Sequence, residues 1–214
     1  FETSWFTTDE ASPRSARISA RHRKVFEYTN EFSREAQDNA ASIDKERYSL
    51  LDGERAATLP PGLWDIDQAF CAADWLAIHY QKKVVKTLKA GHVAAFLTAV
   101  GYLSYTDLLS TPVIISGIIC LMLFAVVNNA LAVRGGWQRK YLDYRTLAEG
   151  LRVQFYWAAA GVTSGNVSKF AHDNFLQMQD PDLGWIRNVM RVAGTECDVA
   201  PSRDSASLEF VLRQ

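Results

Sequence analysis

Lysine and arginine are absent from residues 90–133, and Asp107 is the only formally charged residue in that stretch. The whole chain has a net charge of -1 and 48% hydrophobic residues, as an ordinary soluble domain would. The average therefore conceals one very apolar stretch between polar flanks. Such a charge-poor run excludes a solvated surface helix and favours burial in protein or in lipid.

Motifs of catalysis and metal binding are also lacking. There is no Gly-rich phosphate loop, no GxSxG elbow and no CxxC pair, and no HExxH spacing relates the four histidines, His22, His79, His92 and His172. The cysteines are odd in number and widely spaced, which fits neither a disulfide framework nor a zinc site: Cys71, Cys120 and Cys197. We therefore expect no enzyme, no metal site and no cofactor in this segment, and no nucleic-acid partner.

The charge-poor stretch divides into two apolar blocks, residues 90–108 and 113–133. Each has about 20 residues, enough at about 1.5 Å per residue to cross a hydrocarbon core of about 30 Å. Between them, Ser110, Thr111 and Pro112 predict a turn, with Thr111 as N-cap and Pro112 as first helical residue. The pattern predicts a transmembrane hairpin. The alternative is a buried hairpin in a soluble protein; the second block, apolar on every face, argues against it.

Basic residues flank both blocks and are absent from the turn. The positive-inside rule then places both ends in the cytoplasm and the turn outside. The residues expected to meet anionic lipid headgroups are Lys82, Lys83, Lys86, Lys89 and Arg134.

The flanks predict an all-α protein. Residues 1–20 are expected to link to a missing upstream domain, 21–89 to form cytoplasmic helices that lead into the membrane, and 134–214 to form a cytoplasmic helical region. The periodicity predicts helices over 21–51, from Asp65 or Asp67 into the first block, over 137–157, 167–179 and 182–193, with a loop at 53–62. Gly135 and Gly136 predict a bend after the second block.

Polar residues within the blocks are candidates for lining a pore, because polar groups are costly in lipid. Asn128 and Asn129 either line an ion path or form hydrogen bonds between helices. Adjacent residues point about 100° apart on a helix, so each can take a different role. Thr98 is a further candidate, and Asp107 is either part of an acidic outer ring or a solvated helix end.

Small residues recur every four positions in the first block at Gly91, Ala95 and Ala99. Such a face lets helices approach closely, so packing is its expected role. A two-helix hairpin cannot enclose an aqueous path alone. A channel would therefore require several copies of the chain around an axis.

Four segments in order resemble the bacterial SLATT family, the two-transmembrane effectors associated with SMODS and SLOG domains. They are residues 26–36 (FEYTNEFSREA), residues 70–83 (FCAADWLAIHYQKK), the hairpin, and residues 141–157 (YLDYRTLAEGLRVQFYW). The residues that match its most specific motif, expected to form a structural or coupling network, are Tyr144, Arg145, Glu149 and Arg152.

This resemblance implies an oligomeric pore-forming effector of the bacterial inner membrane, acting in anti-phage or conflict defence. It implies gating by an upstream sensor domain that binds a nucleotide-derived signal. The alternative is a membrane anchor and oligomerisation scaffold whose activity resides in that upstream domain.

Overall fold

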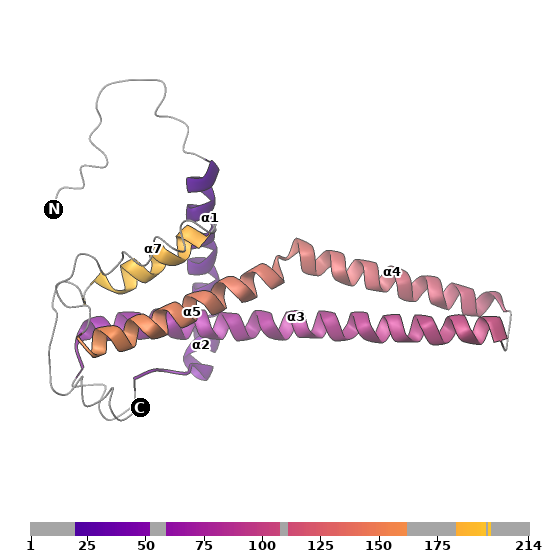
Figure 1. Cartoon of the computed structure of the whole chain (residues 1–214), viewed down its shortest axis with the longest axis horizontal. Helices are drawn as coiled ribbons and strands as arrows, with labels where there is room; N and C mark the ends of the chain where they lie inside the picture. Colours follow the sequence, from indigo (N-terminus) through magenta and orange to yellow (C-terminus); the bar gives the residue numbers. More distant parts are fainter. Residues whose placement is uncertain (1–19, 52–58, 108–110, 162–182, 196, 198–214) are drawn as a thin grey trace, which may run out of the picture.

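A computed structural model describes residues 20–51, 59–107, 111–161, 183–195 and 197. This part of the chain is helical, without strands (Figure 1). Its helices are α1 (Ala20–Asp38), α2 (Ala40–Glu46), α3 (Pro61–Asp107), α4 (Pro112–Arg134), α5 (Trp137–Ala159) and α7 (Gly184–Ala193). The predicted linker before residue 20 and the predicted helix over 167–179 lie outside the described residues.

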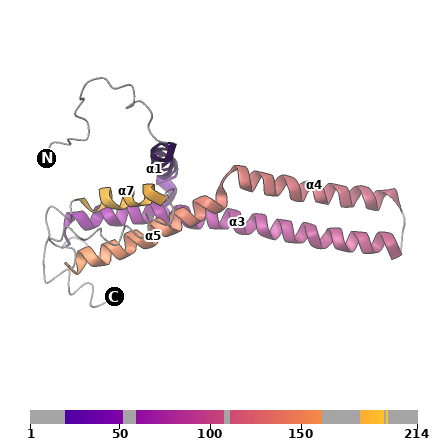
Figure 2. The ribbon, with the colours of Figure 1, turned by 45° about the horizontal axis from the view of Figure 1, so that its top comes forward.

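The longest element is α3, whose 47 residues extend about 70 Å at 1.5 Å per residue. Its first part packs into a bundle with α1, α5 and α7. Its second part projects from that bundle beside the antiparallel α4 (Figures 1 and 2). We call residues 90–107 together with 112–133 the rod, and the remaining described residues the body.

The apolar stripe of α3 is the side that the body buries. Ile66, Phe70 and Ala73 are fully buried, and Ala77 and Tyr80 are nearly so. They meet the buried stripe of α5, including Tyr144, Ala148, Leu151 and Phe155. Helices α1 and α7 pack against this pair of helices through an aromatic cluster. The ring centroids of Phe32, Tyr144 and Trp185 lie about 6 Å apart.

Two predicted boundaries before the rod are wrong. The expected helix over 21–51 breaks at Asn39, whose side-chain amide donates to the carbonyl of Glu35 (2.8 Å). Residues 47–51 then leave the helix, since Asp67 accepts hydrogen bonds from the Leu50 amide (2.6 Å) and the Ser49 hydroxyl (2.8 Å). The next helix begins at Pro61 and not at Asp65 or Asp67, because proline is well suited to a first helical turn.

The boundaries around the rod follow the sequence signals closely. Helix α4 begins at Pro112 with Thr111 in the N-cap position, although the threonine side chain makes no capping hydrogen bond. It ends at the two glycines, where Gly136 has a φ of 60°. This left-handed conformation favours glycine, so the chain can turn from α4 into α5 there.

Candidate functional site

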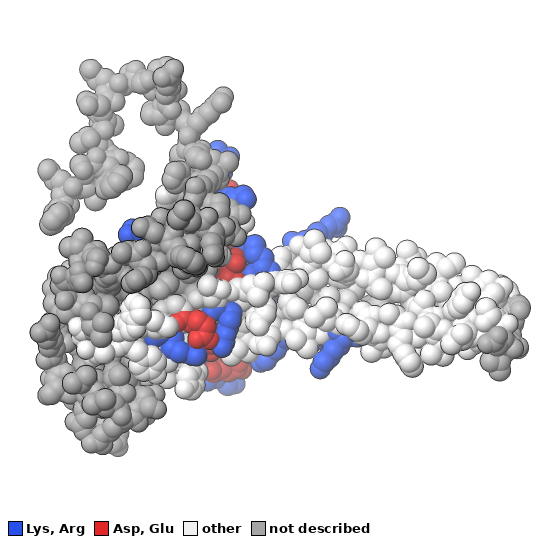
Figure 3. All heavy atoms as spheres, in the orientation of Figure 1, with Lys and Arg blue, Asp and Glu red and all other residues white. Residues whose placement is uncertain are grey.

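The rod exposes apolar side chains along its length. No residue of α4 is buried, and Leu123 and Val126 are 59% and 65% exposed. On α3, Phe96 and Leu103 are also exposed. Figure 3 shows no charged side chain on the visible described surface of the rod, while charges of both signs gather on the body. A soluble monomer rarely exposes so large an apolar patch, so we expect lipid or another protein surface to cover the rod.

Among the described helices, α4 alone is long and apolar enough to cross a membrane by length and composition. The rod part of α3 is more polar because His92, Thr98 and its tyrosines dilute it. The two halves of the hairpin therefore differ in character: α4 is apolar throughout, and α3 carries polar groups.

The two asparagines of α4 take different positions. The Asn128 amide donates to the Thr87 carbonyl of α3 (3.1 Å), so it joins the two helices within one chain. The Asn129 side chain is exposed and lies beside a groove between α3 and α4. Of the other pore candidates, Thr98 is half-buried, and Asp107 belongs to the last turn of α3, with its side chain outside the described set.

The predicted small-residue face does not contact α4. Ala95 and Ala99 are exposed, and a Cβ added to Gly91 would meet nothing within 4 Å. The close approach uses other small residues: Ala94 is buried, and a Cβ added to Gly101 would lie 3.2 Å from Ile118. The face of Gly91, Ala95 and Ala99 is therefore open at the rod surface.

A cluster of acids, bases and phenols joins α1 to the start of α5. Lys140 donates to both Glu31 (2.8 Å) and Glu35 (2.5 Å) of α1. Arg139 pairs with Glu31 at 2.7 Å. We call these residues, together with Tyr80 and Tyr144, the α1 cluster. It lies immediately after the Gly135–Gly136 turn, so it links α1 to the helix that leaves the rod.

Two phenols complete the α1 cluster from the core side. Tyr144 of α5 donates to Glu35 at 2.8 Å, and Tyr80 of α3 donates to the same carboxylate at 2.9 Å. Glu35 thus accepts hydrogen bonds from two helices other than its own. Charge-assisted bonds of this kind are stronger than neutral ones and position α1 specifically.

The pKa values in the α1 cluster favour its ionised form. Burial alone would raise the pKa of Glu31, but hydrogen bonds from Lys140 and Arg139 outweigh it and hold the pKa below its usual value. Burial would lower the pKa of Lys140, but its hydrogen bonds to the two glutamates raise it instead. Burial, reinforced by the charge of Glu35, raises the pKa of Tyr144.

We expect the body to lose stability in acid. Glu31 has a lower pKa in the fold than in the unfolded chain, so its contribution to stability is complete above its ordinary pKa of 4.5 and disappears as the pH falls through the folded pKa. Protonation of His79 has the same effect. Burial and Lys83 lower the pKa of its imidazole below the usual 6.5, so stability decreases as the pH falls below that value. Urea unfolding between pH 7 and pH 3 should show decreasing stability. Glu31→Gln should flatten the acid part of that profile alone; an unchanged profile in this variant would contradict the assignment.

The four residues predicted as one coupling network belong to two groups. Arg145 pairs with Glu149 (2.6 Å) and Asp74 (3.2 Å), and Arg152 pairs with Glu149 (3.1 Å). Tyr144, by contrast, points into the α1 cluster. Arg145 ties α5 to α3 through Asp74, whose side chain is 11% exposed. The two ion pairs of Glu149 are more exposed, and each contributes about 0–1 kcal/mol.

The basic residues at the base of the rod have no carboxylate partner among the described ion pairs. Lys83 instead lies 4.8 Å from the ring centroid of Tyr80 and 5.9 Å from that of Trp137. Figure 3 shows basic side chains on both sides of this base. We call Lys82, Lys83, Lys86, Lys89 and Arg134 the basic collar.

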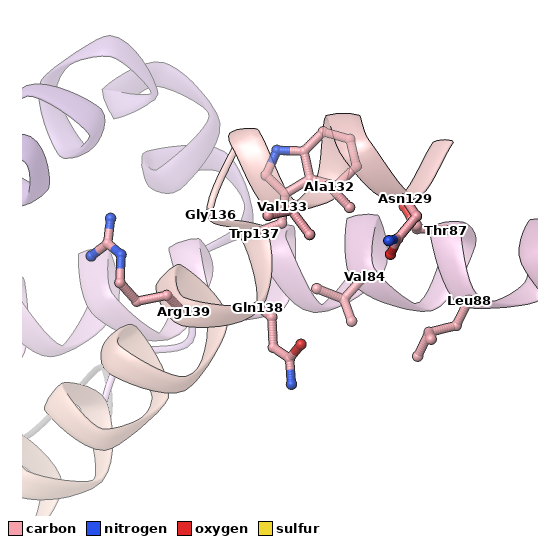
Figure 4. A pocket seen from close by; sticks show the side chains of 10 residues that line it. All are labelled: Val84, Thr87, Leu88, Asn129, Ala132, Val133, Gly136, Trp137, Gln138 and Arg139. Carbon is pink, nitrogen blue, oxygen red and sulfur yellow. The ribbon is translucent and has the colours of Figure 1, made fainter. Parts of the chain in front are cut away.

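The groove at the base of the rod has a volume of about 290 Å³. Its walls come from α3 and α4, and the start of α5 lines its end nearer the body (Figure 4). The lining residues are Val84, Thr87, Leu88, Asn129, Ala132, Val133, Gly136, Trp137, Gln138 and Arg139.

The α1 cluster was not predicted from the sequence, since Glu35 is 45 residues from Tyr80, and both glutamates are more than 100 residues from their partners on α5. A weak signal was present: the two glutamates are four residues apart on α1 and flank the apolar position of Phe32. No group of three or more His, Cys, Asp or Glu side chains suited to a metal occurs within the described ranges. The chain matches no protein-family model, no curated protein and no solved structure.

Proposed function

We propose that this chain is an oligomeric membrane effector whose rod crosses the bilayer twice and forms a pore gated from the cytoplasm. The observation that supports it best is the rod itself, which exposes apolar side chains and ends at the basic collar, for which the described ion pairs include no carboxylate. Apolar side chains favour hydrocarbon, and lysines at its edge favour anionic headgroups. The resemblance to the SLATT effectors supports a role for such a pore in bacterial anti-phage defence.

The dimensions of the rod suit two spans. The 23 residues of α4 extend about 34 Å, and residues 90–107 of α3 extend about 27 Å, against a hydrocarbon core of about 30 Å. The more polar α3 is acceptable in lipid when one side faces α4 and another faces a second copy. The open face of Gly91, Ala95 and Ala99 offers that second contact.

The α1 cluster supplies the cytoplasmic control in this proposal. It fixes α1 to Arg139 and Lys140 of α5, three and four residues after Gly136. A signal that moves α1 would therefore act directly on the turn through which the rod joins the body. A sensor upstream of α1, receiving a nucleotide-derived signal, is positioned in sequence to give that movement.

Ion flux through proteoliposomes tests the pore, with Asn129→Leu and Asn128→Leu compared. Asn129 has an exposed side chain, so its replacement should change conductance; Asn128 already bonds to Thr87, so its replacement should mainly lower stability, by about 0.6–1.7 kcal/mol. Flux that is present in the wild type and altered in Asn129→Leu supports the pore. Equal flux in all three proteins contradicts the lining role of Asn129.

The second candidate function is an anchor and oligomerisation scaffold for an upstream domain. The hydrogen bond of Asn128 within the chain favours it, because this bond explains the polar side chain in α4 without a water-filled path. An anchor conducts no ions even with the upstream domain and candidate nucleotides present. That absence of flux would replace the pore proposal with this one.

A further inference from the structure

The groove between α3 and α4 is lined on both walls by apolar side chains. Val84 and Leu88 come from α3, and Ala132 and Val133 come from α4. Its apolar walls offer water few hydrogen-bond partners. An apolar chain is the better occupant.

The groove runs along the rod, away from the body (Figure 4). Gln138 lies at the end nearer the body, whereas Leu88 and Asn129 lie further along the rod (Figure 4). Arg139 contributes to the lining, but its guanidinium points away, toward its ion pairs with Glu31 and Asp143. The groove thus begins next to the body and continues along the rod between its apolar walls.

Basic side chains near the groove favour an anionic amphiphile as its occupant. The ammonium of Lys83 lies 5.9 Å from the ring centroid of Trp137, a lining residue. Lys83 belongs to the basic collar, for which the described ion pairs include no carboxylate. A headgroup phosphate placed near Gln138 and Lys83 would supply the missing negative charge, with an acyl chain directed along the rod.

We infer that this groove is a binding site for one acyl chain of an anionic phospholipid from the cytoplasmic leaflet. The inference rests on the proposed membrane function, because only an inserted rod brings the groove to the level of the headgroups. The bound chain would fill the space between α3 and α4 next to the turn into α5. The lipid would therefore stabilise the connection between rod and body.

Native mass spectrometry of the full chain, released from nanodiscs of phosphatidylglycerol and phosphatidylethanolamine, tests the site. Ala132→Phe fills the groove from α4, and Val84→Phe fills it from α3. Val126→Phe adds the same ring at an exposed position of α4 and serves as the control. We expect one phosphatidylglycerol per chain to survive in the wild type and in Val126→Phe, and at least tenfold less in both groove variants. Equal retention in all four proteins overturns the inference.

A second measurement needs no groove-filling variant. Phosphatidylglycerol brominated on its acyl chain should quench Trp137, and the quenched signal should disappear in Trp137→Phe. Identical quenching in the wild type and in Trp137→Phe would overturn the inference. Flotation with liposomes separates this result from failure of the proposed function: chains that float but retain no lipid refute the groove alone, and chains that do not float refute membrane insertion as well.

Discussion

Replacing Leu123 by arginine is expected to reduce membrane insertion about 100-fold. Leu123 lies at the middle of α4 and is 59% exposed. A charged residue at the centre of a spanning helix costs about 2.5–3.5 kcal/mol, and each 1.4 kcal/mol is a factor of ten. At an exposed position in water the same substitution would change the free energy of unfolding by only about 0.5 kcal/mol.

Liposome flotation measures this effect, with Val192→Arg as the control. Val192 lies on α7 in the body and is 76% exposed, so arginine there should leave flotation unchanged. The comparison separates a membrane rod from a soluble hairpin that another protein covers. If both arginine variants float as the wild type does, α4 is not in the hydrocarbon.

Lys140→Met is expected to release α1 and to destabilise the body by about 3 kcal/mol, the lower end for breaking a buried ion pair. The Lys140 side chain is 14% exposed and bonds to both Glu31 and Glu35. Its removal leaves the largely buried Glu35 carboxylate without a cation, since Arg139 pairs with Glu31. Urea unfolding gives the stability, and hydrogen exchange over residues 20–38 reports whether α1 is released.

Arg152→Met is the matched control, since Arg152 is also an ion-paired residue of α5, but its partner Glu149 is 43% exposed and keeps its ion pair with Arg145. It should cost about 1 kcal/mol or less. Adding Glu35→Gln to Lys140→Met should recover part of the lost stability, because it removes the unpaired buried charge. Similar losses for Lys140→Met and Arg152→Met would mean that the α1 cluster has no special role. Under the proposed function, Lys140→Met should also change ion flux.

Local signals predicted the rod helices and the long helix of the body. The Thr111–Pro112 pair and the two glycines define α4 to within a residue of the predicted block, because caps and glycines act over one turn. The apolar stripes of α3 and α5 identified their buried sides, since helical periodicity reports burial directly. These features depend on neighbouring residues only.

The functional arrangement depends on contacts between distant residues and could not be predicted in the same way. The motif grouped Arg145 with Glu149, which do pair, but nothing in the sequence indicated that Lys140 would contact two glutamates of α1. Tyr144 was grouped with its sequence neighbours, whereas its side chain points to the opposite group. The groove is formed by three helices, and a periodic pattern within one helix does not indicate how the three are placed relative to one another.

Labelling of single cysteines in intact cells tests the central claim, that the rod crosses the membrane twice. Thr111→Cys reports on the turn at the end of the rod and Gln81→Cys on the body, both at exposed positions. The background replaces Cys71, Cys120 and Cys197 by alanine. A membrane-impermeant maleimide should label Thr111→Cys from outside the cytoplasmic membrane, and Gln81→Cys only after permeabilisation. Labelling of both positions only after permeabilisation would contradict the two spans.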